Sequence, residues 1–171
     1  MVTGLSDFRT ETLVCLLFVL LLLFGCDQPL QRLVKGEAVP DFELIRLDGT
    51  PLAFPASQQG EVAVIQFWAD WCSLCVEELR DAEGLYQALR KRGLAVIAIN
   101  VQQSRETVRG FIADRGLSYE ILLDQQGDVA RRYGVVGLPA TFIVDRRGKL
   151  HTRIIGGTSS EQLLRIINEL L

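Results

Sequence analysis

Residues 68–78 read WADWCSLCVEE and place two cysteines, Cys72 and Cys75, two residues apart behind a tryptophan. Such a pair can bind a metal, attach a haem, close a structural disulfide or exchange electrons with other thiols. Covalent haem attachment needs a histidine directly after the second cysteine, but position 76 is Val. A structural zinc site needs about four ligands, and beyond the first 26 residues the chain offers only this pair and one histidine, His151. The sequence therefore predicts no bound metal and no haem, and it implies no other cofactor.

A purely structural disulfide between Cys72 and Cys75 is an alternative, but a loop this short gains little entropy on closure. The flanking sequence favours redox exchange. VAVIQFW at residues 62–68 is a short apolar run rich in β-branched and aromatic residues, which indicates a buried strand. Apolar residues then recur at helical spacing, at Cys75, Leu79, Ala82, Tyr86 and Leu89. A helix that begins near Cys72 would favour a thiolate there through its free N–H groups and dipole, with Cys75 sheltered one turn further on.

Strand and helix patterns alternate along the rest of the chain. Asp48-Gly49 lies between two extended pieces, which predicts a β-hairpin. We further expect strands at 94–100, 140–145 and 150–155, helices at 104–115 and 159–171, an extended segment at 119–123 and a short helix or turn at 126–133. Thr158 and Glu161 have the spacing of a capping box for the last helix. This order predicts an α/β domain with a central mixed sheet covered on both faces.

The first 26 residues form a separate segment. Residues 13–26 contain no charge, and a helix of that length spans about 21 Å, short of a hydrocarbon core of about 30 Å. The run therefore fits a secretion signal, and its end, LFGC at residues 23–26, is similar to a bacterial lipoprotein signal, which implies lipid on Cys26. An uncleaved anchor and cleavage to a free soluble form are the alternatives. Each places the domain outside the cytoplasm, and lipid on Cys26 would hold it at a membrane.

The rest of the chain divides into a linker and one domain. Residues 27–39 are polar without a clear period, so we interpret them as the linker and residues 40–171 as the domain. A composition of 49% hydrophobic and 23% charged residues suits a globule with a sizeable core. The formal net charge of −3 provides no basic surface for nucleic acid, so we expect no such partner.

Three stretches resemble one family of proteins: FWADWCSLC at residues 67–75, GDVARRYGV at 127–135 and GLPATFIVD at 137–145. They are similar to the thioredoxin superfamily and, more closely, to its membrane-attached TlpA-like and ResA-like thiol-disulfide oxidoreductases. The similarity runs from about Pro40 to the C-terminus. It implies a thioredoxin fold, with a central mixed β-sheet flanked by helices on both faces, an N-terminal β-hairpin and a helical insert near residues 104–123.

The resemblance implies roles for five residues at the site. Cys72 matches the attacking cysteine of the family, Cys75 the resolving cysteine and Pro139 the cis-proline. The backbone of Leu138 would then face the sulfurs and pair with an extended substrate. Trp71 is expected to cover the sulfurs and to offer substrates an apolar surface.

Two further positions concern proton transfer. Glu78 aligns with an acidic residue that the ResA-like group keeps near its sulfurs, where a partly buried carboxylate with a raised pKa could accept the proton of Cys75. A solvated helix glutamate is the alternative. Gln66 stands where cytoplasmic thioredoxins carry a buried aspartate, and glutamine cannot titrate. Trp68 is expected to pack in the core.

The predicted function is reduction of protein disulfides at the outer face of a bacterial cytoplasmic membrane. The resemblance implies apocytochrome c as a candidate substrate and a transmembrane thiol carrier as the electron source. Ser73 and Leu74 bring no positive charge to stabilise a thiolate strongly, which favours a reductant over a strong oxidant. One alternative is a thiol peroxidase of the same fold, although its Pro-Thr-Cys pattern is missing. The other is a non-enzymatic lipoprotein binding module.

Overall fold

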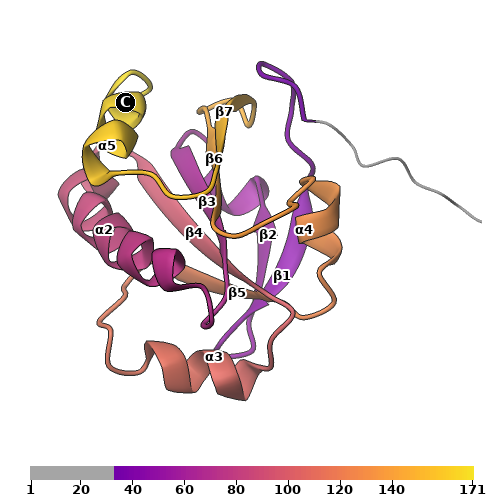
Figure 1. The fold of residues 1–171 in the computed structure, drawn as a ribbon. Helices are drawn as coiled ribbons and strands as arrows, with labels where there is room; N and C mark the ends of the chain where they lie inside the picture. Colours follow the sequence, from indigo (N-terminus) through magenta and orange to yellow (C-terminus); the bar gives the residue numbers. More distant parts are fainter. Residues whose placement is uncertain (1–32) are drawn as a thin grey trace, which may run out of the picture.

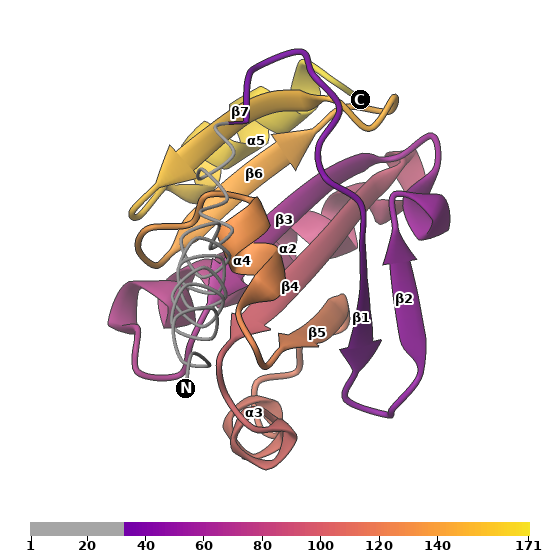
Figure 2. The ribbon, with the colours of Figure 1, turned by 90° about the vertical axis from the view of Figure 1, so that its right-hand side faces the viewer.

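Seven strands form one mixed sheet in the computed structural model, which describes residues 33–171 (Figures 1 and 2). The strands are β1 (Phe42–Arg46), β2 (Pro51–Phe54), β3 (Val62–Trp68), β4 (Leu94–Val101), β5 (Glu120–Asp124), β6 (Ala140–Val144) and β7 (Leu150–Ile155). Their order across the sheet is β2-β1-β5-β4-β3-β6-β7. Strands β3, β4 and β5 run parallel, whereas β6 is antiparallel to β3 and β7 is antiparallel to β6. The predictions for the leader and for Cys26 lie outside the described residues.

Helices cover both faces of this sheet. The α-helices are α2 (Ser73–Leu89), α3 (Arg105–Ile112), α4 (Asp128–Arg132) and α5 (Ser160–Asn168), and short 3-10 helices lie at η1 (Ala56–Gln58) and η2 (Arg90–Arg92). Figure 1 shows α2 and α5 together on one side of the sheet and α4 on the other. The expected mixed sheet with helices on both faces and an N-terminal hairpin is therefore confirmed.

The central strand β3 explains this two-sided arrangement. All seven of its residues are buried, and alternate side chains point to opposite faces. Ile65 and Phe67 enter the core under α4, whereas Val64 and Trp68 enter the core under α2 and α5. A strand covered on both faces needs an apolar side chain at nearly every position, which is why the run at 62–68 is almost continuous.

The chain joins the sheet earlier than Pro40. The N–H of Gly36 donates to the carbonyl of Leu150 (2.7 Å), and the N–H of Val39 donates to the carbonyl of Gly148 (3.1 Å). Val39 is buried in the core under α4. The last part of the segment interpreted as linker is therefore held to the start of β7 by backbone hydrogen bonds.

The start of the last helix corrects a prediction. The N-cap is Ser159, whose hydroxyl accepts a hydrogen bond from the N–H of Gln162, and the helix covers Ser160–Asn168. Thr158 lies one residue before the cap, and its own N–H donates to Glu78 on α2. The predicted capping box of Thr158 and Glu161 was therefore wrong by one residue. Among residues 33–171, none of the helices combines the length and apolar character that crossing a membrane requires.

Candidate active site

Cys72 and Cys75 lie where β3 ends and α2 begins. Cys72 is the N-cap of α2, and its Sγ accepts a hydrogen bond from the N–H of Cys75 at 3.3 Å. The two sulfurs form a disulfide with an S–S distance of 2.08 Å. Because the N-terminal N–H groups and the helix dipole favour negative charge, a reduced Cys72 would be stabilised as a thiolate.

The two cysteines differ in access to solvent. Cys72 retains 8% of its surface, whereas Cys75 is completely buried. As expected, Cys72 is the more exposed of the two cysteines. Its exposed surface is nevertheless small for a sulfur that attacks a substrate. Both belong to the core under α2 and α5, beside Leu79 of the same helix. An incoming sulfur can reach Cys72 first, and Cys75 is held behind it.

The loop before β6 lies beside the loop between β3 and α2, which carries Trp71 and Cys72. The Leu138-Pro139 peptide bond is cis, and Ala140 pairs with Phe67 near the end of β3. Leu138 and Trp71 together line a hollow of about 380 Å³. Trp71 is 72% exposed, so it presents an apolar surface to solvent next to Cys72. Val101, Ala130 and Val135 line the same hollow, so its rim on the side of α4 is largely apolar.

Glu78 is buried one helical turn after Cys75. Its Oε2 accepts a hydrogen bond from Nε2 of Gln66 (2.6 Å), and its Oε1 accepts one from the N–H of Thr158 (2.6 Å). Only 6% of Glu78 and 2% of Gln66 are exposed. Burial raises the pKa of Glu78, while the hydrogen bonds from Thr158 and Gln66 act in the opposite direction. The alternative of a solvated helix glutamate is therefore excluded.

Two of these contacts could not be found by reasoning from the sequence. The resemblance marks Gln66 as the position of a buried aspartate in cytoplasmic thioredoxins but does not show that it contacts Glu78, and Thr158 lies 80 positions away from the glutamate that it contacts. The β7–α5 connection, where Thr158 lies, also lines a second hollow of about 430 Å³ together with Leu74 and Glu78. Glu78, one helical turn after Cys75, thus also borders this second hollow.

Trp68 lies in the core, as expected. It is completely buried and packs on Phe111 of α3, with the ring centroids 5.2 Å apart. Val108 of the same helix is also completely buried, whereas Phe111 is only partly buried. The helical insert therefore covers the end of β3, directly before the loop that carries Cys72.

Comparisons with known proteins agree with this geometry. The model of the AhpC/TSA family matches residues 35–153. Thiol-disulfide oxidoreductase ResA of Geobacillus thermodenitrificans is 34% identical over 127 residues, which cover 74% of this chain and 72% of that protein. Sporulation thiol-disulfide oxidoreductase A of Bacillus subtilis is 27% identical over 133 residues, covering 75% of this chain and 79% of that protein.

Solved structures show the same similarity. A putative thiol:disulfide interchange protein DsbE from Chlorobium tepidum superposes with a TM-score of 0.77 at 28% identity, covering 81% of this chain and 98% of that one. StoA from Bacillus subtilis superposes with a TM-score of 0.65 at 26% identity, covering 76% of this chain and 98% of that one. The fold implied by the three sequence stretches is therefore confirmed.

Proposed function

Because this chain belongs to the AhpC/TSA family of the thioredoxin superfamily and is a thiol-disulfide oxidoreductase of the ResA and DsbE type, we propose that it reduces protein disulfides. We place the reaction outside the cytoplasm, with the domain held to a membrane by its N-terminal segment. The observation that carries the proposal is the Cys72–Cys75 disulfide at the N-terminus of α2, in which Cys72 keeps a small exposed surface and Cys75 keeps none.

The proposed reaction begins with the dithiol form. The Cys72 thiolate attacks a substrate disulfide, so that the substrate S–S bond breaks, one substrate sulfur leaves as a thiolate and a mixed disulfide forms. Cys75 loses its proton to Glu78 and attacks the sulfur of Cys72. This step releases the second substrate thiol and closes the Cys72–Cys75 disulfide. Two electrons have then passed to the substrate, and an external thiol donor must restore the dithiol.

The surroundings of the disulfide support a macromolecular substrate. Trp71, the neighbour of Cys72 in the chain, and Leu138 line one hollow, and the second hollow lies between α2 and the β7–α5 connection. An extended peptide could pair with the backbone at Leu138 while its disulfide reaches Cys72. Pro139 directly precedes β6, whose first residue Ala140 pairs with Phe67 near the end of β3.

The site of action and the partners are inferred from the sequence. The apolar run at residues 13–26, which ends in LFGC, supports export and lipid attachment at Cys26. A domain tethered there would take electrons from a transmembrane thiol carrier, and apocytochrome c is the candidate substrate. The named relatives are thiol-disulfide oxidoreductases and interchange proteins, so they lend no support to the peroxidase or binding-module alternatives.

Capture of substrates tests the proposal directly. A Cys75→Ser variant cannot resolve the mixed disulfide, so full-length protein expressed in bacterial cells should accumulate covalent adducts with extracytoplasmic proteins. The adducts should disappear when a reductant is added and should be absent from a Cys72→Ser, Cys75→Ser double variant. Mass spectrometry of the captured proteins would identify the substrates. If Cys75→Ser yields no adduct beyond the double variant, the proposed function is wrong.

Replacement of Glu78 by glutamine tests proton transfer. We expect Glu78→Gln to slow disulfide reduction at neutral pH by about tenfold to a hundredfold, because glutamine cannot accept the proton of Cys75. Single-turnover rates of the dithiol form, measured from acid to alkaline pH, would show the change. The matched control is Glu77→Gln, since Glu77 is exposed and directly precedes Glu78. An unchanged pH–rate profile would remove Glu78 from the mechanism.

The same variant has a predicted effect on stability. Burial raises the pKa of Glu78 in the folded state, so the stabilising contribution of its protonated form is complete below the ordinary carboxyl pKa of about 4.3. That contribution is lost as the pH rises through the raised pKa. Relative to Glu78→Gln, the wild type should therefore lose free energy of unfolding as the pH rises above the ordinary carboxyl pKa and through the raised pKa of Glu78. Urea unfolding of both proteins measures this difference, and parallel pH dependences would contradict the shift.

A further inference from the structure

A small network of side chains fixes the loop between β3 and α2. The N–H of Asp70 donates to Oε1 of Gln103 (3.0 Å), and Nε2 of Gln103 donates to Oδ1 of Asp70 (2.6 Å). Nδ2 of Asn100 donates to the same Oε1 (2.8 Å). One amide group therefore binds both the backbone and the side chain of Asp70. We call these three residues the Gln103 clamp.

The clamp connects the loop between β3 and α2 to a buried part of the sheet. Asn100 is only 1% exposed and lies opposite Trp68 in the register of β3 and β4. Asp70 is the second residue after Trp68 and directly precedes Trp71. Through Gln103, the end of β4 thus holds the backbone immediately before the exposed tryptophan.

The backbone at the end of β4 is shaped to make this contact. Gln102 has a φ of 57°, and among residues 33–171 it is the one non-glycine residue with a positive φ. Its N–H donates to the carbonyl of Asp124 at the end of β5 (3.0 Å). Left-handed backbone is disfavoured for residues with a side chain and is enriched at functional sites. Here it turns the chain directly before Gln103, at the edge of the sheet where Asp70 lies.

Trp71 depends on such support more than the other aromatic residues among 33–171. It is 72% exposed, so packing against the core contributes little to its position. It nevertheless forms one wall of the 380 Å³ hollow that Gln102 and Leu138 also line. The turn that carries Gln103 therefore supplies both the support for Trp71 and part of the hollow that Trp71 borders.

We propose that Gln103 is a positioning residue that holds Asp70 and thereby fixes Trp71 as a wall of the substrate-binding hollow. The inference rests on disulfide exchange at Cys72 and concerns substrate affinity, not sulfur chemistry. Cys72 is held separately, through its N-cap position on α2 and the hydrogen bond from its N–H to the carbonyl of Ala69 (3.2 Å). Loss of the clamp should therefore weaken binding of large substrates and leave the reactivity of the sulfur unchanged.

Kinetics with a large and a small disulfide separate these effects. For Gln103→Ala and Asp70→Ala in the full chain, we expect KM for insulin to rise by about tenfold with kcat nearly unchanged. The rate with 5,5′-dithiobis(2-nitrobenzoate), a small disulfide that does not depend on contact with Trp71, should stay within about twofold of wild type. Asp70→Asn should restore a KM near the wild-type value, because its amide oxygen can still accept from Gln103. Gln125→Ala, at an exposed glutamine between β5 and α4, is the matched control.

Coupling to Trp71 and a spectroscopic measurement complete the test. Trp71→Ala should itself raise KM for insulin, and adding Gln103→Ala should cause no further rise. In NMR spectra, the indole signal of Trp71 should shift or broaden in Gln103→Ala and not in Gln125→Ala. Additive effects, an unchanged Trp71 signal, or equal losses with both disulfides would overturn the positioning role. Failure of the wild type to reduce insulin would count against the proposed reductase function. The indole signal of Trp71 would still show whether the Gln103 clamp fixes the position of Trp71.

Discussion

Replacing Cys72 by serine is expected to abolish disulfide exchange, lowering kcat/KM by at least about a thousandfold. Cys72 is the sulfur at the N-terminus of α2, and Cys75 is completely buried behind it. A serine hydroxyl cannot form the mixed disulfide, and Cys75 cannot reach a protein substrate in its place. Insulin reduction with a chemical electron donor measures the loss.

The matched control for this variant is Cys75→Ser. It should retain the first step, attack on a disulfide, and lose only turnover, because Cys72 keeps its position at the helix N-terminus. In the wild-type dithiol, iodoacetamide should modify Cys72 faster at neutral pH than Cys75 and faster than a free cysteine, whose pKa is about 8.5. Substantial turnover by Cys72→Ser, or alkylation of Cys72 no faster than that of free cysteine, would contradict this assignment.

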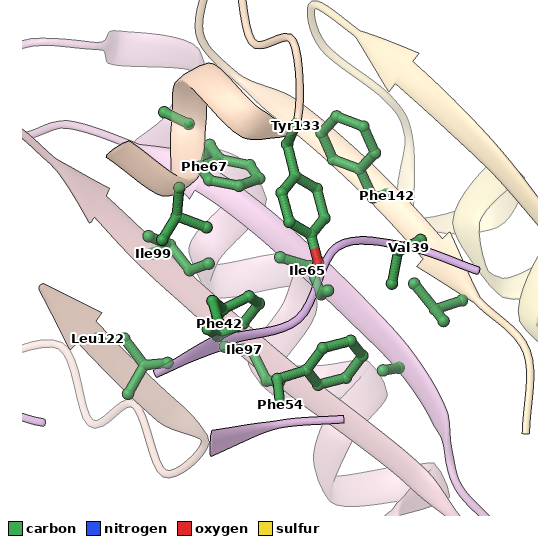
Figure 3. Packing of buried hydrophobic residues seen from close by; sticks show 14 of the residues in the cluster. Val39, Phe42, Phe54, Ile65, Phe67, Ile97, Ile99, Leu122, Tyr133 and Phe142 are labelled. Carbon is green, nitrogen blue, oxygen red and sulfur yellow. The ribbon is translucent and has the colours of Figure 1, made fainter. Parts of the chain in front are cut away.

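Replacing Phe142 by alanine is expected to lower the free energy of unfolding by about 3–5 kcal/mol, the largest loss of stability among the variants proposed. Phe142 is completely buried in β6. Its ring meets Phe67 and Tyr133 edge-on, with centroids 5.6 Å and 5.2 Å apart, and Figure 3 shows these aromatic side chains packed together. Alanine would leave a cavity between the sheet and α4, which the surrounding strands cannot close. Urea unfolding followed by far-UV circular dichroism measures the change.

Phe142→Leu is the control, with an expected loss of about 1 kcal/mol, since most of the buried volume is kept. Phe142 and Cys72 lie in cores on opposite faces of the sheet, and this separation provides a second check. Phe142 belongs to the core under α4, whereas Cys72 belongs to the core under α2 and α5. Below its melting temperature, Phe142→Ala should therefore keep the alkylation rate of Cys72 within about twofold of wild type. A loss below about 1 kcal/mol would show that the cavity collapses.

Much of the fold could be predicted from patterns within short stretches of sequence. The run at residues 62–68 forms β3, and Cys72 lies at the start of α2. These features follow from side-chain period and from the residues at helix ends, which act over a few positions. The cap of α5 shows how far such reasoning extends. Thr158 and Ser159 are both suitable N-caps, and in the folded protein Ser159 is the cap while the N–H of Thr158 donates to Glu78 on α2.

The order of strands and helices and the place of the cysteine pair at a helix N-terminus follow from the amino-acid pattern alone, because both depend on neighbouring residues. The surroundings of that pair depend on how the strands and helices assemble. Gln66 and Thr158 meet Glu78, and Gln103 meets Asp70, because the sheet order brings together segments from 12 to 80 residues apart. The raised pKa of Glu78 arises from that assembly, since burial is a property of all the packed segments together and not of any one stretch.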